Sequence, residues 1–160
     1  MTPTFAGHSL LWRFPLVAIF AIFGANVFLD AGIRGHLSAT LARGLARIGL
    51  DAAFAARHAE LAVYAGAALE LSGAAALAQH GGERCGAAML GAFMLLVTPI
   101  VHWPFQDDAT GAASATLSQH HLIETLKNLS IMGGLWLAWN VGCDNAAEKK
   151  AAKKAAAKVA

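Results

Sequence analysis

The stretch LAVYAGAALELSGAAAL, residues 61–77, holds one charged residue, Glu70, among small and apolar side chains. The apolar run reaches from about Ala59 to Gln79. A helix needs roughly 20 mostly apolar residues to cross the hydrocarbon core of a bilayer. The stretch therefore predicts a membrane-spanning helix. Its carboxyl group needs an explanation, because an ionisable side chain inside a membrane is costly unless it is paired or neutral.

The composition of the chain supports a membrane protein. Of its 160 residues, 57% are hydrophobic and only 14% are charged, and the mean hydropathy is +0.52. Soluble domains average about a quarter charged residues. So few polar residues cannot cover a soluble domain of this size, and we expect an integral membrane protein.

Three further apolar stretches predict membrane-spanning helices, at about 10–30, at 85–105 and at about 121–141. The first contains FPLVAIFAIFGANVFLD (14–30) and has no convincing small-residue cleavage site, so we interpret it as a retained helix and not as a secretory signal. The predicted fold is therefore all-α, a bundle of four transmembrane helices.

The loop between the first two predicted spans, residues 30–58, is too long for a plain turn. Leucines and an isoleucine recur in it at helical spacing, whereas two arginines fall on other faces: Leu37, Leu41, Leu45 and Ile48, against Arg43 and Arg47. This pattern predicts a helix in the membrane interface, with its arginines at the headgroups. A soluble helix that covers the end of the bundle fits the pattern equally well.

The basic residues concentrate at the C-terminal end, where five of the twelve Lys and Arg residues lie between Lys149 and Lys158. We divide the chain into a transmembrane domain, 1–145, and a basic Ala/Lys-rich tail, 146–160. A tail of this kind indicates no nucleic-acid partner. It either extends the last helix and meets anionic lipid or is a solvated tail with no specific role, and at this stage we favour the solvated tail. With an even number of spans, these lysines place both termini on the cytoplasmic side of a bacterial-type inner membrane. Four arginines in 30–58 oppose that orientation.

Six polar residues at membrane depth form the predicted polar core: Glu70, Lys127, Asn128, His102, Asn26 and Arg13. Gly66 and Gly73 share a helix face with Glu70 and would let a neighbouring helix approach, so we expect Glu70 to point into the bundle. Lys127 either pairs locally with Glu124 or reaches across to Glu70. We favour the pair with Glu70, because Glu70 has no other obvious partner.

The sequence contains no recognisable catalytic motif, such as a nucleophile elbow, a zinc-protease motif or a P-loop. Five of the seven histidines are expected on one side of the membrane, but their spacing fits no metal site. We therefore predict no metal, with His102, His120 and His121 as weak candidate ligands.

Three motifs resemble the DoxX family of small four-helix membrane proteins: ELSG (70–73), VTPIVHWPF (97–105) and LKNLSIMGGLWLAW (126–139), which follow Arg13 at the start of the first span. The similarity covers about residues 10–142. It implies a four-helix bundle linked to membrane redox chemistry, because the family's namesake belongs to a thiosulfate:quinone oxidoreductase. By position, Glu70, His102, Lys127 and Asn128 carry the family's polar motif residues.

Several functions remain open at this stage. We favour an accessory membrane subunit that anchors or stabilises a larger membrane complex, expected to be a redox or electron-transfer complex. The alternative is a quinone-interacting subunit, with Glu70, His102 and Lys127 around the quinone head. A small transporter and a metal- or haem-binding membrane protein are further alternatives. Whether the chain is an enzyme stays undecided.

Overall fold

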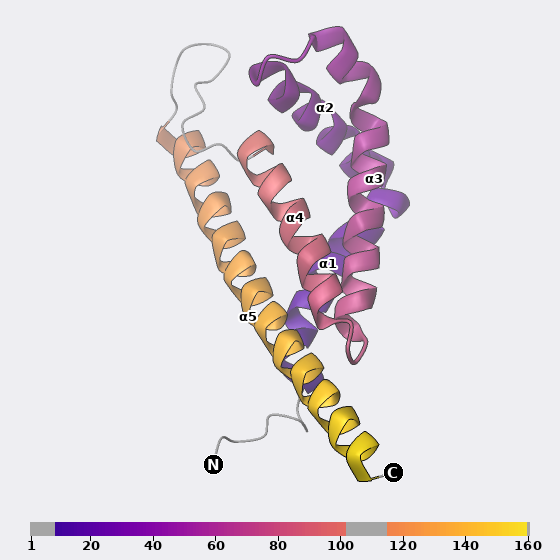
Figure 1. Cartoon of the computed structure of the whole chain (residues 1–160). Coiled ribbons are helices and arrows are strands. Elements are labelled where there is room, and N and C mark those ends of the chain that lie inside the picture. Colours follow the sequence, from indigo (N-terminus) through magenta and orange to yellow (C-terminus); the bar gives the residue numbers. More distant parts are fainter. Residues whose placement is uncertain (1–8, 102–114, 160) are drawn as a thin grey trace.

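A computed structural model of the chain describes residues 9–101 and 115–159, with side chains placed over 13–101 and 122–158. Five helices and no strand make up these residues, which confirms the all-α prediction for them. The helices are α1 (Ser9–Leu29), α2 (Ala31–Arg47), α3 (Ala52–Ala78), α4 (Glu83–Val101) and α5 (Ala115–Val159). Four of them run along the length of the molecule, and α2 crosses near one end (Figure 1).

Two described helices, α3 and α4, are long and apolar enough to cross a membrane. The described part of α1 and α2 would together count as a third, broken span, bent by 101°. The expected four spans are thus met only in part. Helix α5 does not qualify, since Glu124, Lys127 and Asn128 dilute its apolar stretch.

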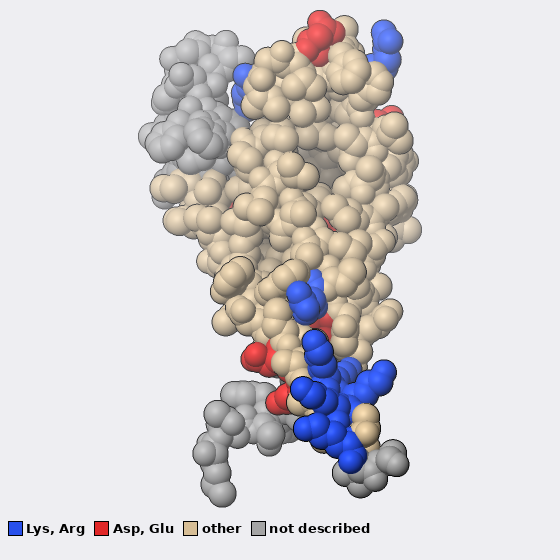
Figure 2. All heavy atoms as spheres, viewed as in Figure 1, with Lys and Arg blue, Asp and Glu red and all other residues tan. Residues whose placement is uncertain are grey.

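Large apolar side chains are exposed along the described helices. Phe14, Phe23, Leu95, Trp136 and Leu137 are each at least half exposed. On the face shown in Figure 2, charged side chains gather toward the two ends and the middle is almost entirely uncharged. A soluble protein rarely exposes such an apolar surface, so this surface indicates contact with lipid.

The corner between α1 and α2 is held by two side chains. The Asp30 carboxylate caps α2 and accepts hydrogen bonds from the backbone N–H groups of Gly32 and Ile33, at 2.7 and 3.1 Å. Arg34 donates to the Val27 carbonyl at 3.2 Å and lies 3.3 Å from the Glu60 carboxylate. The chain therefore turns sharply after α1 instead of continuing the helix.

Helix α2 confirms the predicted helix in the first loop. Three of its predicted apolar positions are half-buried, and Arg43 and Arg47 are exposed as expected. Ile48, predicted on the apolar face, is 60% exposed, because it caps the end of the helix and points away. At Gly44, an added Cβ would lie 2.3 Å from the carbonyl oxygen of Ile100, so α2 rests directly on the end of α4.

The second predicted span begins earlier than expected. Asp51 accepts a hydrogen bond from the Phe54 N–H at 2.8 Å and starts α3 at Ala52, about two turns before Ala59. Arg57 and His58 thus belong to the first turns of a spanning helix and not to a loop. At the other end of the chain, α5 continues through the predicted tail, because Ala and Lys are good helix formers.

Helix α4 packs between α3 and α5. It approaches α3 most closely at Gly86, where an added Cβ would lie 2.5 Å from the backbone nitrogen of Leu77 and 2.7 Å from the carbonyl oxygen of Gly73. The core around this contact comes from four helices: Phe20, Ala74, Leu77, Ala87, Leu90, Met94, Leu135 and Ala138. Small residues at helix contacts compensate for the weak hydrophobic drive between helices in lipid.

Replacement of Gly86 by alanine should lower the stability of the bundle by about 1–3 kcal/mol, because the methyl group would force the backbones of α3 and α4 apart. Gly91→Ala, in the same helix, is the matched control, since nothing lies within 4 Å of its added Cβ. Thermal unfolding of both variants in detergent would measure the difference. Equal melting temperatures for the two would contradict the close contact at Gly86.

Candidate functional site

Five polar side chains are buried among the described residues: Arg13, Glu70, Glu83, Thr98 and Asn128. They do not gather into one site. Arg13 and Glu83 lie at one end of the bundle, Thr98 and Asn128 connect α4 and α5, and Glu70 lies on the inner face of α3. Each group therefore has to be assessed separately.

The Arg13 guanidinium joins three helices. Its Nη1 donates to the Glu83 carboxylate at 3.0 Å, to the Leu77 carbonyl at 2.9 Å and to the Gln79 carbonyl at 3.3 Å. Both charged side chains are 1% exposed. The start of α1 is thereby connected to the end of α3 and to the start of α4. A buried pair with these extra hydrogen bonds is far more stable than either charge buried alone.

The sequence predicted Arg13 as a member of the polar core but missed Glu83. A signal for Glu83 was present. In an antiparallel arrangement, α1 and α4 both start at the same end of the bundle, and α4 begins with Glu83, a charge opposite in sign to Arg13 near the start of α1. Opposite charges at equal depth on neighbouring spans are the pattern that would have found this pair.

Asn128, also predicted, donates to the Thr98 hydroxyl at 3.2 Å, between α5 and α4. The two side chains are 7% and 8% exposed. Thr98 was not predicted, because threonine is common in membrane helices and carries no charge. Hydrogen bonds of this kind between spans typically contribute about 0.6 kcal/mol. Asn128 therefore has a packing role between α4 and α5.

Glu70 points into the bundle as predicted. It is 9% exposed, and its neighbours on the helix face approach α4, with Gly66 against Phe93 and Gly73 against Leu90. It forms no ion pair or hydrogen bond with any described residue. A carboxyl group is costly to bury in an apolar setting without a partner, so Glu70 is the least satisfied polar side chain of α3.

The expected pair between Glu70 and Lys127 is wrong. Lys127 pairs instead with Glu124, three residues before it on α5, and is 46% exposed. The physical reason is the position of α4, which packs between α3 and α5 and keeps these two helices apart. A lysine on the outer face of α5 satisfies its charge locally and turns toward the surface.

The other predicted site residues do not form a common site with Glu70 among the described residues. Asn26 is half-buried, and its backbone carbonyl accepts the Asp30 N–H at 2.9 Å. His102 lies outside the described residues, and His120 and His121 belong to α5 without described side chains. Within the described residues, no three His, Cys, Asp or Glu side chains come together as metal ligands.

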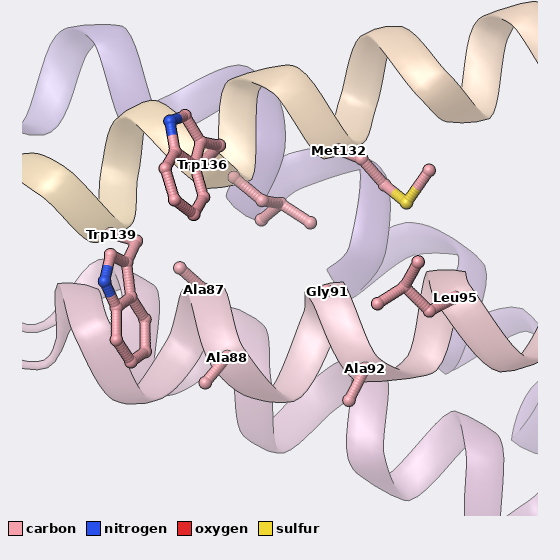
Figure 3. A pocket seen from close by; sticks show the side chains of 9 residues that line it. Ala87, Ala88, Gly91, Ala92, Leu95, Met132, Trp136 and Trp139 are labelled. Atoms are coloured by element: carbon pink, nitrogen blue, oxygen red, sulfur yellow. The ribbon is translucent and has the colours of Figure 1, made fainter.

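An apolar groove of about 450 Å³ lies between α4 and α5 and was not predicted. Small residues of α4 form its floor, at Ala87, Ala88, Gly91 and Ala92. The rings of Trp136 and Trp139 stand at one end, and Met132 and Leu95 lie at the other (Figure 3). The sequence signal is the repeat of small residues four apart, 87 with 91 and 88 with 92.

The tryptophan end of the groove is held in place from outside. The Arg84 guanidinium lies 4.9 Å from the centre of the Trp139 ring, a distance that allows a cation–π interaction. Arg84 also covers Gly142, where an added Cβ would lie 2.7 Å from its Cγ. The groove thus has a fixed end near the α3–α4 turn and an open, apolar middle.

The chain matches no family model, and no similar protein was found among curated proteins or solved structures.

Replacement of Arg13 by methionine should destabilise the bundle by about 3–5 kcal/mol, because it leaves the Glu83 carboxylate buried without its cation. The double variant Arg13→Met/Glu83→Leu should recover a large part of that loss. Unfolding of the wild type, both single variants and the double variant gives a double-mutant cycle. Additive losses in the double variant would show that the two charges do not depend on each other.

Proposed function

We propose that the chain is a DoxX-like accessory subunit that anchors or stabilises a larger membrane complex, of the redox or electron-transfer kind. In this proposal α1, α3, α4 and α5 cross the membrane and α2 lies in its interface. The membrane is a bacterial-type inner membrane, with both ends of the chain in the cytoplasm.

The groove between α4 and α5 carries the proposal. Helices associate in lipid through close packing, which small residues permit. Gly91 and its alanine neighbours offer such a surface, and exposed Trp136, at 66%, borders it. A spanning helix of a partner subunit, with large side chains facing the groove, fits this shape and its lack of polar groups.

The arrangement of the polar groups supports a structural role over a catalytic one. Arg13 with Glu83, and Asn128 with Thr98, each connect two helices through a buried hydrogen bond. Such pairs hold the register of a bundle without the need for a substrate. The chemistry of the complex would then belong to the partner, which would carry the redox centre.

The four-span topology is supported by the lipid-type surface of α1 and α5. Phe14, Ile22 and Phe23 on α1, with Leu129 and Leu137 on α5, are all more than half exposed. Apolar side chains on both helices would be costly to expose to water. The lysines at the end of α5 agree with a cytoplasmic C-terminus, by the excess of positive charge found in cytoplasmic segments.

Gly91→Leu should fill the groove and release the partner while the bundle stays folded, because its added Cβ meets open space. The measurement is the recovery of tagged chain and partner from native membranes in mild detergent, with an absorption spectrum to detect a flavin, haem or iron–sulfur centre. We expect a stoichiometric complex for the wild type and at least a tenfold loss of partner for the variant.

Gly133→Leu, on α5 and outside the groove, is the matched control, since its added Cβ also meets open space. It should keep the full complement of partner. Thermal unfolding of both leucine variants checks that neither has lost its fold. A wild-type chain that purifies alone from native membranes, or equal retention of the partner by both variants, would contradict the proposal.

Glu70 favours a second candidate function, contact with a quinone. A buried carboxyl group with no partner among the described residues can exchange a proton or a hydrogen bond with a quinone carbonyl. This candidate expects a quinone to co-purify with the wild-type complex and to be lost, or no longer reduced, in Glu70→Gln. Full quinone turnover in that variant would leave Glu70 as a packing residue and favour the accessory role alone.

A further inference from the structure

The last turns of α5 carry a dense positive charge. Five lysines lie within ten residues, at 149, 150, 153, 154 and 158, and all five are exposed. In Figure 2 their side chains form one continuous basic region at one end of the molecule. We propose that this basic segment, Lys149–Lys158, binds the anionic headgroups of the membrane in which the bundle sits. The inference rests on the membrane insertion in the proposed function.

The depth of the segment fits the headgroup layer. The turn between α3 and α4 marks one end of two helices that can cross a membrane, and the amine of Lys149 lies level with it, because a Cβ added to Gly81 would be 3.3 Å from its Nζ. At about 1.5 Å per residue, Lys154 lies roughly 8 Å farther out and Lys158 roughly 14 Å. The headgroup layer is about 5–8 Å thick, so four of the five amines can reach it.

The lysines share one side of the helix. At about 100° per residue, all five fall within one half of the circumference. Alanines fill most of the other half. Lys149, at one edge of this half, faces the turn at Gly81, and the half extends from there around the helix to Lys158, on the side away from the turn. Arg84, exposed on α4 beside Trp139, adds another positive charge near the turn.

The acidic groups nearby do not cancel this charge. Asp144 and Glu148 are exposed on α5, but their spacing places them on the half of the helix opposite the lysines. Glu83 is buried against Arg13. His80, also at this end, is 65% exposed and adds a positive charge only when it is protonated. The lysine half of the helix therefore stays positive.

Anionic lipid is the occupant that this surface fits best. The segment continues directly from a helix of the bundle, which keeps its first four lysines close to the headgroup layer. Its other face holds alanine and not the large apolar residues with which a helix docks on a protein. Clusters of four to eight basic residues next to a membrane helix attract anionic headgroups through their charge.

The test measures the preference of the full chain for anionic lipid. The protein is reconstituted into phosphatidylcholine vesicles that contain brominated phosphatidylglycerol or brominated phosphatidylcholine, and quenching of its tryptophan fluorescence gives the relative affinity. One lysine near the surface contributes about 1 kcal/mol, or roughly fivefold in affinity. We expect the wild type to prefer phosphatidylglycerol at least fivefold. The preference should fall to about one when all five lysines are replaced by glutamine, and in 1 M salt.

Replacement of all five lysines by arginine, which changes the same positions but keeps their positive charge, is the matched control and should keep the preference. Circular dichroism checks that the glutamine variant remains helical. A wild-type ratio near one, or the same ratio in the glutamine variant, overturns the inference. An alkaline wash separates the two proposals: a chain released from the vesicles contradicts membrane insertion and with it both proposals, whereas a retained chain without preference contradicts this inference alone.

Discussion

The bundle depends on the ion pair between Arg13 and Glu83. Both charges are almost fully buried, and the same guanidinium also satisfies the carbonyl groups of Leu77 and Gln79 at the end of α3. Carbonyl groups at the end of a helix need partners from outside the helix, because no later turn donates to them. The Arg13 side chain on α1 is such a partner, and it also pairs with the Glu83 carboxylate on α4. The relative heights of three helices follow from this contact.

The rest of the packing depends on these relative positions of the helices along the bundle. With α3 and α4 joined at this end, Gly86 meets the backbone of Leu77 and the two helices run in contact along their small residues. Helix α4 then separates α3 from α5, and its other side forms the floor of the groove. The polar groups are distributed along the bundle as local links between helices. The buried polar side chains of the described residues thus form separate contacts and not one cluster.

Much of this fold could be predicted from the sequence. The helical class, the helix in the first loop and the inward direction of Glu70 follow from local patterns, since each depends on spacing within one helix. The Glu70–Lys127 pair was wrong, because helix spacing shows which face a residue occupies but not which helix lies opposite. The pair of Glu83 with Arg13 was missed for the same reason. Helix α3 starts earlier than predicted, because the Asp51 side chain caps it and a hydropathy pattern does not detect a helix cap.

The sequence by itself determined which residues are helical, which faces are apolar and where charge accumulates, because these properties depend on near neighbours in the chain. Only the tertiary structure decided the partners. Lys127 pairs with Glu124 on its own helix. Because α4 packs between α3 and α5, Glu70 on α3 does not pair with Lys127 on α5. Arg13 pairs with Glu83, which lies 70 residues later in the sequence. The choice of partner is made by the arrangement of helices in space, which is a property of the whole bundle.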